Sequence, residues 1–207
     1  MPHTLKYYKR NLPHWLVADH SYFVTLRLKG TLPKAVVEHI RAEDDGSSEE
    51  TATAQARERF CTMERILDAL TDARWLTDPR VAPLIWDNLD WMRGRGWKIY
   101  AAVLMPNHMH WLLRNEQGRT EQLLNDLGQF KSFTAKRANK VLSRGGAFWA
   151  REDFDHWIRN RGKFEATIRY IANNPVKAGL ARHWSAWPWF TVDESVRSFL
   201  PDAEASS

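Results

Sequence analysis

The spacing of apolar residues predicts four strands in the chain. Residues 21–28 are rich in β-branched and aromatic side chains with partial alternation, which is typical of a strand. Residues 97–104 and 108–114 lie on either side of Met105-Pro106-Asn107, so we expect a hairpin with a tight turn there. Residues 154–159 predict a fourth, short strand.

Helical spacing separates these strands, because apolar residues recur three or four positions apart in four stretches. These residues are Phe60, Met63, Leu67 and Leu70; Val81, Ile85, Leu89 and Met92; Leu123, Leu127, Phe130, Thr134, Ala138 and Val141; and Phe164, Ile168 and Ile171. The third helix is expected from an N-cap at Thr120 to Gly145-Gly146, and the last is expected to end before Pro175. This order predicts an α+β fold, a small antiparallel sheet with helices packed on one face.

The length of 207 residues suits one core domain with an appended tail. We expect a domain over residues 1–182 and an aromatic tail over residues 183–207. The polar, acidic segment that begins at Glu43 predicts a loop or disordered insertion. Cys61 is the single cysteine, which excludes an internal disulfide and a multi-cysteine zinc site. No apolar run is long enough to span a membrane and no signal-peptide core is present, so we expect a soluble, cytoplasmic protein.

The net charge of +5 is concentrated in one part of the chain. Residues 130–182 hold 12 basic and 4 acidic side chains, whereas residues 1–129 hold 17 of each. Six aromatic residues are interleaved with the basic ones: Phe130, Phe133, Phe148, Trp149, Phe154 and Trp157. Basic side chains neutralise phosphates and aromatic faces stack on exposed bases, so this stretch favours single-stranded nucleic acid over a merely solvated basic surface.

The pair His108 and His110 is the first candidate for chemistry. Side chains alternate along a strand, so both imidazoles point to one face while Met109, Trp111 and Leu113 point to the other, into a core. Two imidazoles on an outward face could hold one metal ion. The alternative interpretation of the pair is solvated surface or packing, because a His-x-His arises by chance in a chain with 8 histidines.

The last predicted helix carries the second candidate group. Tyr170 lies off the centre of its apolar face, close to Asn173 and Asn174. A tyrosine there can be simply an interfacial aromatic residue. However, a phenol is also a nucleophile toward phosphorus, and a basic surround favours its ionised form. Asn174 would offer a third metal ligand, and because Pro175 disturbs the helix before it, Asn173 is the alternative.

Three separated motifs resemble the REP-associated branch of the single-tyrosine transposases. The first is His108-Met109-His110 with its flanks, similar to their His-hydrophobic-His signature, and the second is the tyrosine helix from Tyr170 to Leu180. The intervening segment around residues 148–159 is the third. Further similarity extends from about residue 10 to 190, with residues 43–55 as an insertion and Phe190 in place of the small polar residue expected after Trp189.

The resemblance implies a ferredoxin-like fold and a DNA-nicking and rejoining activity. It implies that His108, His110 and Asn174 hold Mg²⁺ or Mn²⁺ at the scissile phosphate of single-stranded DNA. Tyr170 would attack phosphorus and form a 5′-phosphotyrosine link, which a 3′-hydroxyl later reverses without ATP. The partner would be hairpin DNA of the repetitive extragenic palindromic type, bound in the cytoplasm at the nucleoid by a monomer or a dimer.

The same resemblance places DNA contacts in the basic stretch and the tail. The candidates are Lys131, Lys136, Arg137, Lys140, Arg151, Arg159, Arg161, Lys163, Arg169, Trp187 and Trp189. The tryptophans could equally cap the core. Two other functions remain open: a non-catalytic ferredoxin-like module that binds single-stranded nucleic acid, and a metal-dependent phosphodiesterase that uses water.

Overall fold

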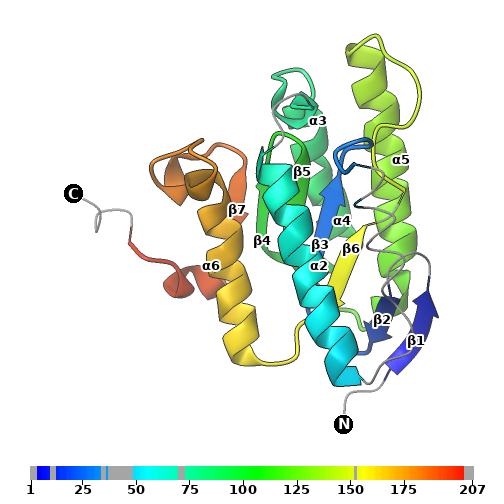
Figure 1. Cartoon of the computed structure of the whole chain (residues 1–207), viewed down its shortest axis with the longest axis vertical. Helices are drawn as coiled ribbons and strands as arrows, with labels where there is room; N and C mark the ends of the chain where they lie inside the picture. Colours follow the sequence, from blue (N-terminus) through cyan, green and yellow to red (C-terminus); the bar gives the residue numbers. More distant parts are fainter. Residues whose placement is uncertain are drawn as a thin grey trace.

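A five-stranded antiparallel sheet forms the centre of the molecule (Figure 1). The computed structural model describes residues 4–9, 13–33, 36, 49–69, 73–151 and 153–202. The strand order is β6-β3-β5-β4-β7. The strands are β3 (Tyr22–Arg27), β4 (Trp97–Leu104), β5 (His108–Asn115), β6 (Phe154–Trp157) and β7 (Phe190–Val192). A separate antiparallel pair consists of β1 (Thr4–Lys9) and β2 (Pro13–Val17).

The connections confirm the expected ferredoxin-like arrangement. β3 and β4 are both antiparallel to β5, which lies between them, so the two strands run in the same direction and form a split βαβ unit. β6 pairs with the other edge of β3. The hairpin predicted around residues 105–107 is present, and its strands begin and end within one residue of the predicted positions.

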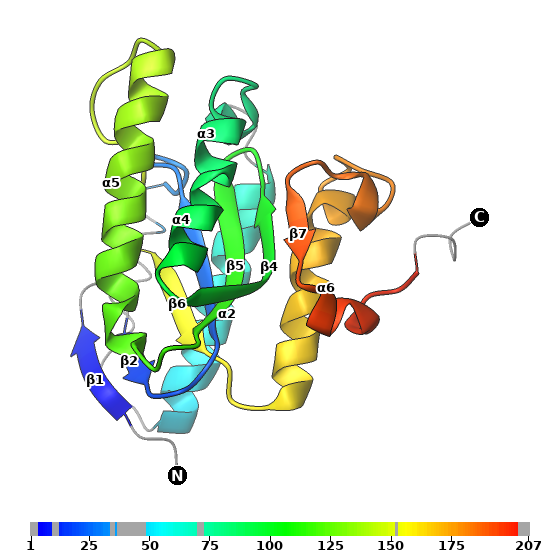
Figure 2. The ribbon, with the colours of Figure 1, turned by 180° about the vertical axis from the view of Figure 1, so that it is seen from behind.

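Helices cover both faces of this sheet, which corrects the expectation that they pack on one face. The α-helices that the structure describes are α2 (Glu49–Ala69), α3 (Ala82–Trp86), α4 (Asn88–Gly94), α5 (Leu123–Val141) and α6 (Arg161–Lys177). Figure 1 views the sheet from the side of α2 and α6, and Figure 2 views it from the side of α3, α4 and α5. The central strands β3 and β5 are buried on both faces, so each face needs its own layer of helices.

The two faces have separate cores. On the α3–α5 side, Met109, Trp111 and Leu113 of β5 pack with apolar residues of α4 and α5 such as Phe130. On the α2–α6 side, Leu112 of β5 packs with apolar residues of β4 and α6. The alternation along β5 therefore predicts correctly which residues share a face.

Four boundaries differ from the sequence prediction. Residues 49–55, expected in the insertion, form the first turns of α2, because Glu, Ala and Gln, which make up most of this segment, have high helix propensity. Residues 43–48 lie outside the described residues. The helix expected over residues 81–92 is divided into α3 and α4 at Asp87. Residues 120–122 form a short 3₁₀ helix, η2, in which Thr120 makes no side-chain cap, and α5 ends at Val141.

The helix α6 also extends beyond its predicted end. It continues through Pro175 to Lys177. A proline near the end of a helix removes few backbone hydrogen bonds, so the last turn can form around it.

The described part of the tail, up to residue 202, packs onto the sheet. Strand β7 pairs with β4, and the Trp187 indole N–H donates to the carbonyl oxygen of Leu104 over 3.0 Å. Three short 3₁₀ helices, η1 (Trp75–Thr77), η3 (Trp184–Ala186) and η4 (Glu194–Phe199), complete the fold. None of the helices in the described residues has the length and apolar character to cross a membrane.

Candidate functional site

Strand β5 presents His108 and His110 to the same face, as the alternation predicts. Their ring centroids lie 4.6 Å apart. The expectation that this face is outward is wrong, because both rings are buried, with exposed fractions of 1% and 0%. The cause is the second helix layer, in which α2 and α6 cover this part of the sheet (Figure 1).

Helix α2 adds a carboxylate that the sequence analysis did not identify. Glu64 is 4% exposed, and its Oε2 lies 3.1 Å from His110 Nε2. One ligand atom each from Glu64, His108 and His110 lie within 4.8 Å of one another. A sequence signal for Glu64 existed: it follows Phe60 by four residues and precedes Leu67 by three, so it is an acidic residue inside the apolar stripe of a helix.

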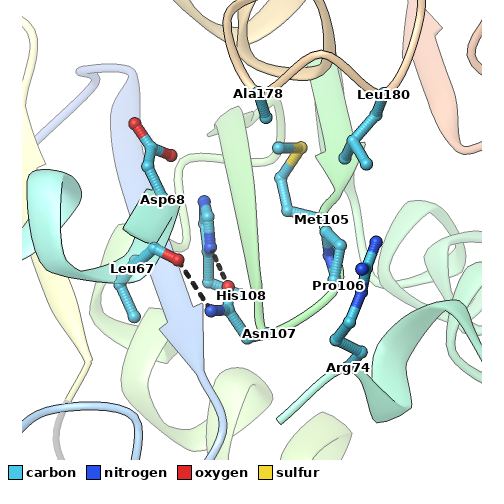
Figure 3. A pocket seen from close by; sticks show the side chains of 9 residues that line it. All are labelled: Leu67, Asp68, Arg74, Met105, Pro106, Asn107, His108, Ala178 and Leu180. Carbon is cyan, nitrogen blue, oxygen red and sulfur yellow. Dashed lines mark hydrogen bonds between the residues drawn. The ribbon is translucent and has the colours of Figure 1, made fainter. Parts of the chain in front are cut away.

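Asn107 fixes the proton position on His108. The Asn107 Nδ2 donates to the carbonyl oxygen of Leu67 over 2.8 Å, so its Oδ1 faces His108 Nδ1 at 2.6 Å (Figure 3). An amide oxygen accepts only, and therefore His108 Nδ1 carries the proton. The Nε2 of His108 is then a bare lone pair, and this buried atom has no hydrogen-bond partner in the part of the chain that the structure describes. His108 is thus in the tautomer that a metal ion requires.

His110 is held by hydrogen bonds at both ring nitrogens. Its Nδ1 lies 2.9 Å from Thr25 Oγ1 on the neighbouring strand β3, and its Nε2 faces Glu64. Thr25 can accept or donate, so it supports either tautomer of the ring. When Nε2 gives up its proton to bind an ion, Nδ1 can donate to Thr25 instead.

Tyr170 on α6 reaches the same cluster. It is partly buried, its ring centroid is 5.5 Å from that of His110, and its hydroxyl donates a hydrogen bond to Glu64 Oε2. Burial and the adjacent Glu64 carboxylate raise the pKa of the Tyr170 hydroxyl. The expectation that a basic surround favours the ionised phenol is therefore wrong for this arrangement, because the nearest charged group is an anion.

Asn174 shares the inward side of α6 with Tyr170. It is 3% exposed, whereas Asn173 points to solvent. The Asn174 Nδ2 donates to the Tyr170 carbonyl oxygen over 2.8 Å, and its side chain lies next to the His108 ring. Of the two asparagines, Asn174 is the one that faces the histidines.

The charges of the cluster suit a cation. Burial would raise the pKa of the Glu64 carboxyl, but the adjacent histidines, His110 above all, and the Tyr170 hydroxyl lower it to about 2. Burial, and then the neighbouring His110, lower the pKa of His108 to about 3. Near neutral pH the cluster thus holds a carboxylate and a neutral imidazole. Two of its buried ligand atoms, Glu64 Oε1 and His108 Nε2, have no partner among the described residues, so the donor set fits a divalent metal ion.

Two cavities lie on either side of this cluster. One, of about 140 Å³, is lined by His108, Asn107 and Met105, by Arg74 near η1 and by Asp68 of α2, among others (Figure 3). The other, of about 180 Å³, lies between α2 and α6 and is lined by Phe23, Phe60, His156, Lys163, Ala166, Thr167 and Tyr170. The first opens onto a metal-ligand candidate and the second onto the phenol.

The candidate DNA-binding residues divide between the two sides of the sheet. Lys136, Arg137 and Lys140 are exposed on α5, on the side away from Tyr170 (Figure 2). Arg161, Lys163 and Arg169 belong to α6, which carries Tyr170, and Arg159 lies just before it.

Other candidates among these residues take part in intramolecular contacts. The Lys131 ammonium lies 2.6 Å from Asp153 Oδ1, in an ion pair that is mostly buried. Arg151 is exposed. Trp187 and Trp189 are partly buried and pack against the sheet, so capping of the core accounts for them, and their contact with DNA stays a prediction.

Comparisons with known proteins show what the chain resembles in sequence and in fold. No protein-family model matches the chain. The REP-associated tyrosine transposase of Escherichia coli (strain K12) is 30% identical over 104 residues, which span 50% of this chain and 59% of that protein. The matched segment therefore represents little more than half the length of this relative.

The fold has a counterpart among solved structures. The structure of a REP-associated tyrosine transposase bound to a REP hairpin has a TM-score of 0.53 with this chain, at 18% sequence identity. The alignment covers 95% of this chain and 89% of the other. This likeness confirms the fold, and the curated relative confirms the resemblance that the motifs indicate.

Proposed function

We propose that this chain is a REP-associated tyrosine transposase, an enzyme that nicks and joins single-stranded DNA at REP-type hairpins. The observation that carries the proposal is the single hydrogen-bonded cluster in which the Tyr170 hydroxyl meets Glu64 and His110, with His108 beside them. A module that only binds DNA needs no such set. The similarity to a curated transposase supports the same assignment.

A divalent ion, Mg²⁺ or Mn²⁺, would be held by His108 and His110 with Glu64, and Asn174 offers a further oxygen. Glu64 is thus added to the ligands that the sequence predicted. When bound, such an ion neutralises the charge of the scissile phosphate as a Lewis acid. Asn107 and Thr25 orient the two imidazoles from behind, as partners of metal-binding histidines commonly do.

Tyr170 is the nucleophile of the proposal. Its hydroxyl oxygen bonds to phosphorus, the bond from phosphorus to the 3′-oxygen of the preceding nucleotide breaks, and the departing 3′-oxygen takes up a proton in place of the one that the phenol gives up. The products are a 5′-phosphotyrosine link and a free 3′-hydroxyl. A 3′-hydroxyl of another strand then reverses the step, and the phosphodiester energy is conserved, so ATP is not needed.

The substrate strand would approach from the α6 side. Lys163 lines the cavity that Tyr170 borders, and Arg159, Arg161 and Arg169 lie on the same side. Cationic side chains near the nucleophile provide the phosphate contacts that dominate affinity for nucleic acids. The partly exposed ring of Phe60, which lines the same cavity, is suited to stacking with an unpaired base. Hairpin DNA with a single-stranded flank fits this arrangement. The solved structure with a similar fold supports this choice of substrate, because it is described as bound to a REP hairpin.

A covalent-adduct assay tests the proposal. The protein is incubated with Mn²⁺ and hairpin DNA that carries a label on the 3′ side of the scissile phosphate, the side that stays linked to the protein, and the products are separated under denaturing conditions. We expect a protein–DNA adduct from the wild type and none from Tyr170→Phe. The matched control is Tyr100→Phe, because Tyr100 is a partly buried tyrosine of β4 outside the cluster, and it should form the adduct normally.

The other outcomes identify the competing functions. Cleaved DNA without an adduct would indicate a phosphodiesterase that uses water. Binding without cleavage, across hairpins of different sequence, would indicate a non-catalytic module. Adduct formation by Tyr170→Phe would exclude Tyr170 as the nucleophile.

A further inference from the structure

One carboxylate oxygen is shared by His110 and the proposed nucleophile. Glu64 Oε2 faces His110 Nε2 at 3.1 Å and also accepts the hydrogen bond of the Tyr170 hydroxyl. The second oxygen, Oε1, is buried and has no partner among the described residues. Glu64 is therefore the contact point between the candidate metal site and the candidate nucleophile.

We propose that Glu64 couples ion binding to the release of Tyr170: without an ion it holds the hydroxyl, and ion binding weakens that hold. The inference rests on the metal site of the proposed function. It assigns to Glu64 a role beyond that of a ligand, as a positioning residue that acts on the nucleophile.

The argument follows from what each partner does to the carboxylate charge. Without an ion, the anion of Glu64 is stabilised by two donors, His110 Nε2–H and the Tyr170 hydroxyl. An ion held by His110 and Glu64 would take the place of the histidine proton and would neutralise the carboxylate more strongly. A neutralised carboxylate is a weaker acceptor, and so the Tyr170 hydrogen bond loses strength.

Coupling of this kind is reciprocal. If an ion weakens the hydrogen bond between Tyr170 and Glu64, that hydrogen bond must weaken ion binding by the same factor. Removal of the hydroxyl should therefore make the ion bind more tightly. The opposite sign is expected if Tyr170 merely supports a metal ligand from outside, since the loss of such support lowers metal affinity.

The origin of Glu64 gives this coupling a structural meaning. Glu64 comes from α2, which belongs to the long connection between β3 and β4, whereas His108, His110 and Tyr170 lie on β5 and α6. Helix α2 covers the histidines and supplies Glu64 to the cluster at the same time. The nucleophile is thus restrained by an element that is separate from the strand and helix that form the rest of the cluster.

The test is a calorimetric titration of the metal-free protein with Mn²⁺. We expect Tyr170→Phe to bind Mn²⁺ about tenfold more tightly than the wild type. In the wild type, a hydrogen bond to a charged acceptor stabilises the ion-free state and opposes ion binding, and the variant lacks this hydrogen bond. Tyr100→Phe is the matched control and should bind as the wild type does. Equal or weaker binding by Tyr170→Phe overturns the proposal.

A double-mutant cycle assigns the effect to Glu64. In a Glu64→Gln background, which binds Mn²⁺ less tightly, Tyr170→Phe should change the affinity by less than about twofold, because no carboxylate remains for which the ion and the hydroxyl compete. An undiminished gain in that background overturns the role of Glu64. Circular dichroism of each variant confirms that it is folded.

The outcome is distinguishable from failure of the proposed function. The titration reports on the ion and Tyr170 without DNA, and the adduct assay reports on DNA chemistry. Tighter binding by Tyr170→Phe with no wild-type adduct on any hairpin would retain the coupling and reject the transposase. If the wild type binds no Mn²⁺, the coupling is overturned whatever the adduct assay gives.

Discussion

The two faces of strand β5 are both buried, but their side chains have chemically different surroundings. On one face Met109, Trp111 and Leu113 pack into an apolar core against α4 and α5. On the other face His108 and His110 are equally buried, yet they face a carboxylate, amides and a phenol. Residues one position apart on the same strand thus differ completely in their surroundings.

The difference separates residues that stabilise the fold from residues that are arranged for chemistry. Apolar burial contributes stability in proportion to the area removed from water. Buried polar groups contribute little net stability, and each unpaired one costs free energy. Among the described residues, Glu64 Oε1 and His108 Nε2 on the α2–α6 face lack a partner and offer lone pairs to a cation, whereas Trp111 Nε1, which lacks a partner on the opposite face, is an N–H that cannot bind one.

The largest effect is expected on the apolar face. Trp111 is fully buried and packs edge-on against Phe130 with ring centroids 4.7 Å apart. Trp111→Ala should lower the free energy of unfolding by about 3–5 kcal/mol, through lost burial and the cavity left behind. Urea unfolding measures this value. While the variant is folded, its Mn²⁺ affinity should stay within about twofold of the wild type, since mutations without shared partners act independently. A large change in affinity would contradict the separation of the two faces.

The next effect concerns the support of His108. Asn107→Ala removes the acceptor that keeps the proton on His108 Nδ1, so Mn²⁺ affinity should fall by about 10- to 100-fold. The matched control is Asn115→Ala at the other end of β5. Asn115 is also buried, but its Oδ1 accepts from the backbone N–H groups of Gln117 and Arg119, so its loss should affect stability and leave Mn²⁺ affinity unchanged. Equal losses of affinity in both variants would refute the tautomer argument.

The sequence predicted the short-range relations within the site better than the long-range ones. Alternation along residues 108–114 is a local property, so it correctly placed His108 and His110 together and Trp111 opposite. Helical spacing likewise placed Tyr170 close to Asn173 and Asn174 on one helix, without deciding which of the two shares its face. These relations extend over a few residues and need no knowledge of the fold.

The contribution of α2 could not be predicted in the same way. Glu64 and His110 are 46 residues apart, and no short-range pattern states that α2 lies over β5. The burial of the histidines and the raised pKa of Tyr170 both follow from this long-range packing. The available signal was the position of an acidic residue, Glu64, inside the apolar stripe of α2. This position indicates that the carboxylate has a buried partner, but it does not say which residue that partner is.

A third effect concerns acid stability in the presence of a chelator. The pKa of His108 is lowered to about 3 in the folded protein, whereas an unfolded histidine titrates near 6.5. The unfolded state therefore binds this proton first as the pH falls, and stability is lost below about pH 6.5. Between pH 7 and pH 5 the loss due to His108 should be about 2 kcal/mol. Urea unfolding should show a shallower pH dependence for His108→Gln. The Glu64 carboxyl, with a pKa of about 2, loses its contribution only at lower pH. An identical pH dependence in both proteins would show that His108 is not buried as a neutral ring.

The smallest effect compares the charges on the two sides of the sheet. Lys163 borders the Tyr170 cavity on the α6 side, and Lys136 is exposed on α5 on the opposite side. If the cut strand lies along α6, Lys163→Ala should weaken binding of hairpin DNA with a single-stranded flank by about three- to tenfold and lower the salt dependence by about one ion. Lys136→Ala should change the affinity less, because its charge lies across the sheet from Tyr170. Fluorescence anisotropy over a range of salt concentrations measures both quantities. A larger effect of Lys136→Ala would place the DNA across α5, and Tyr170 would then reach the strand only through a different orientation of the two helix layers.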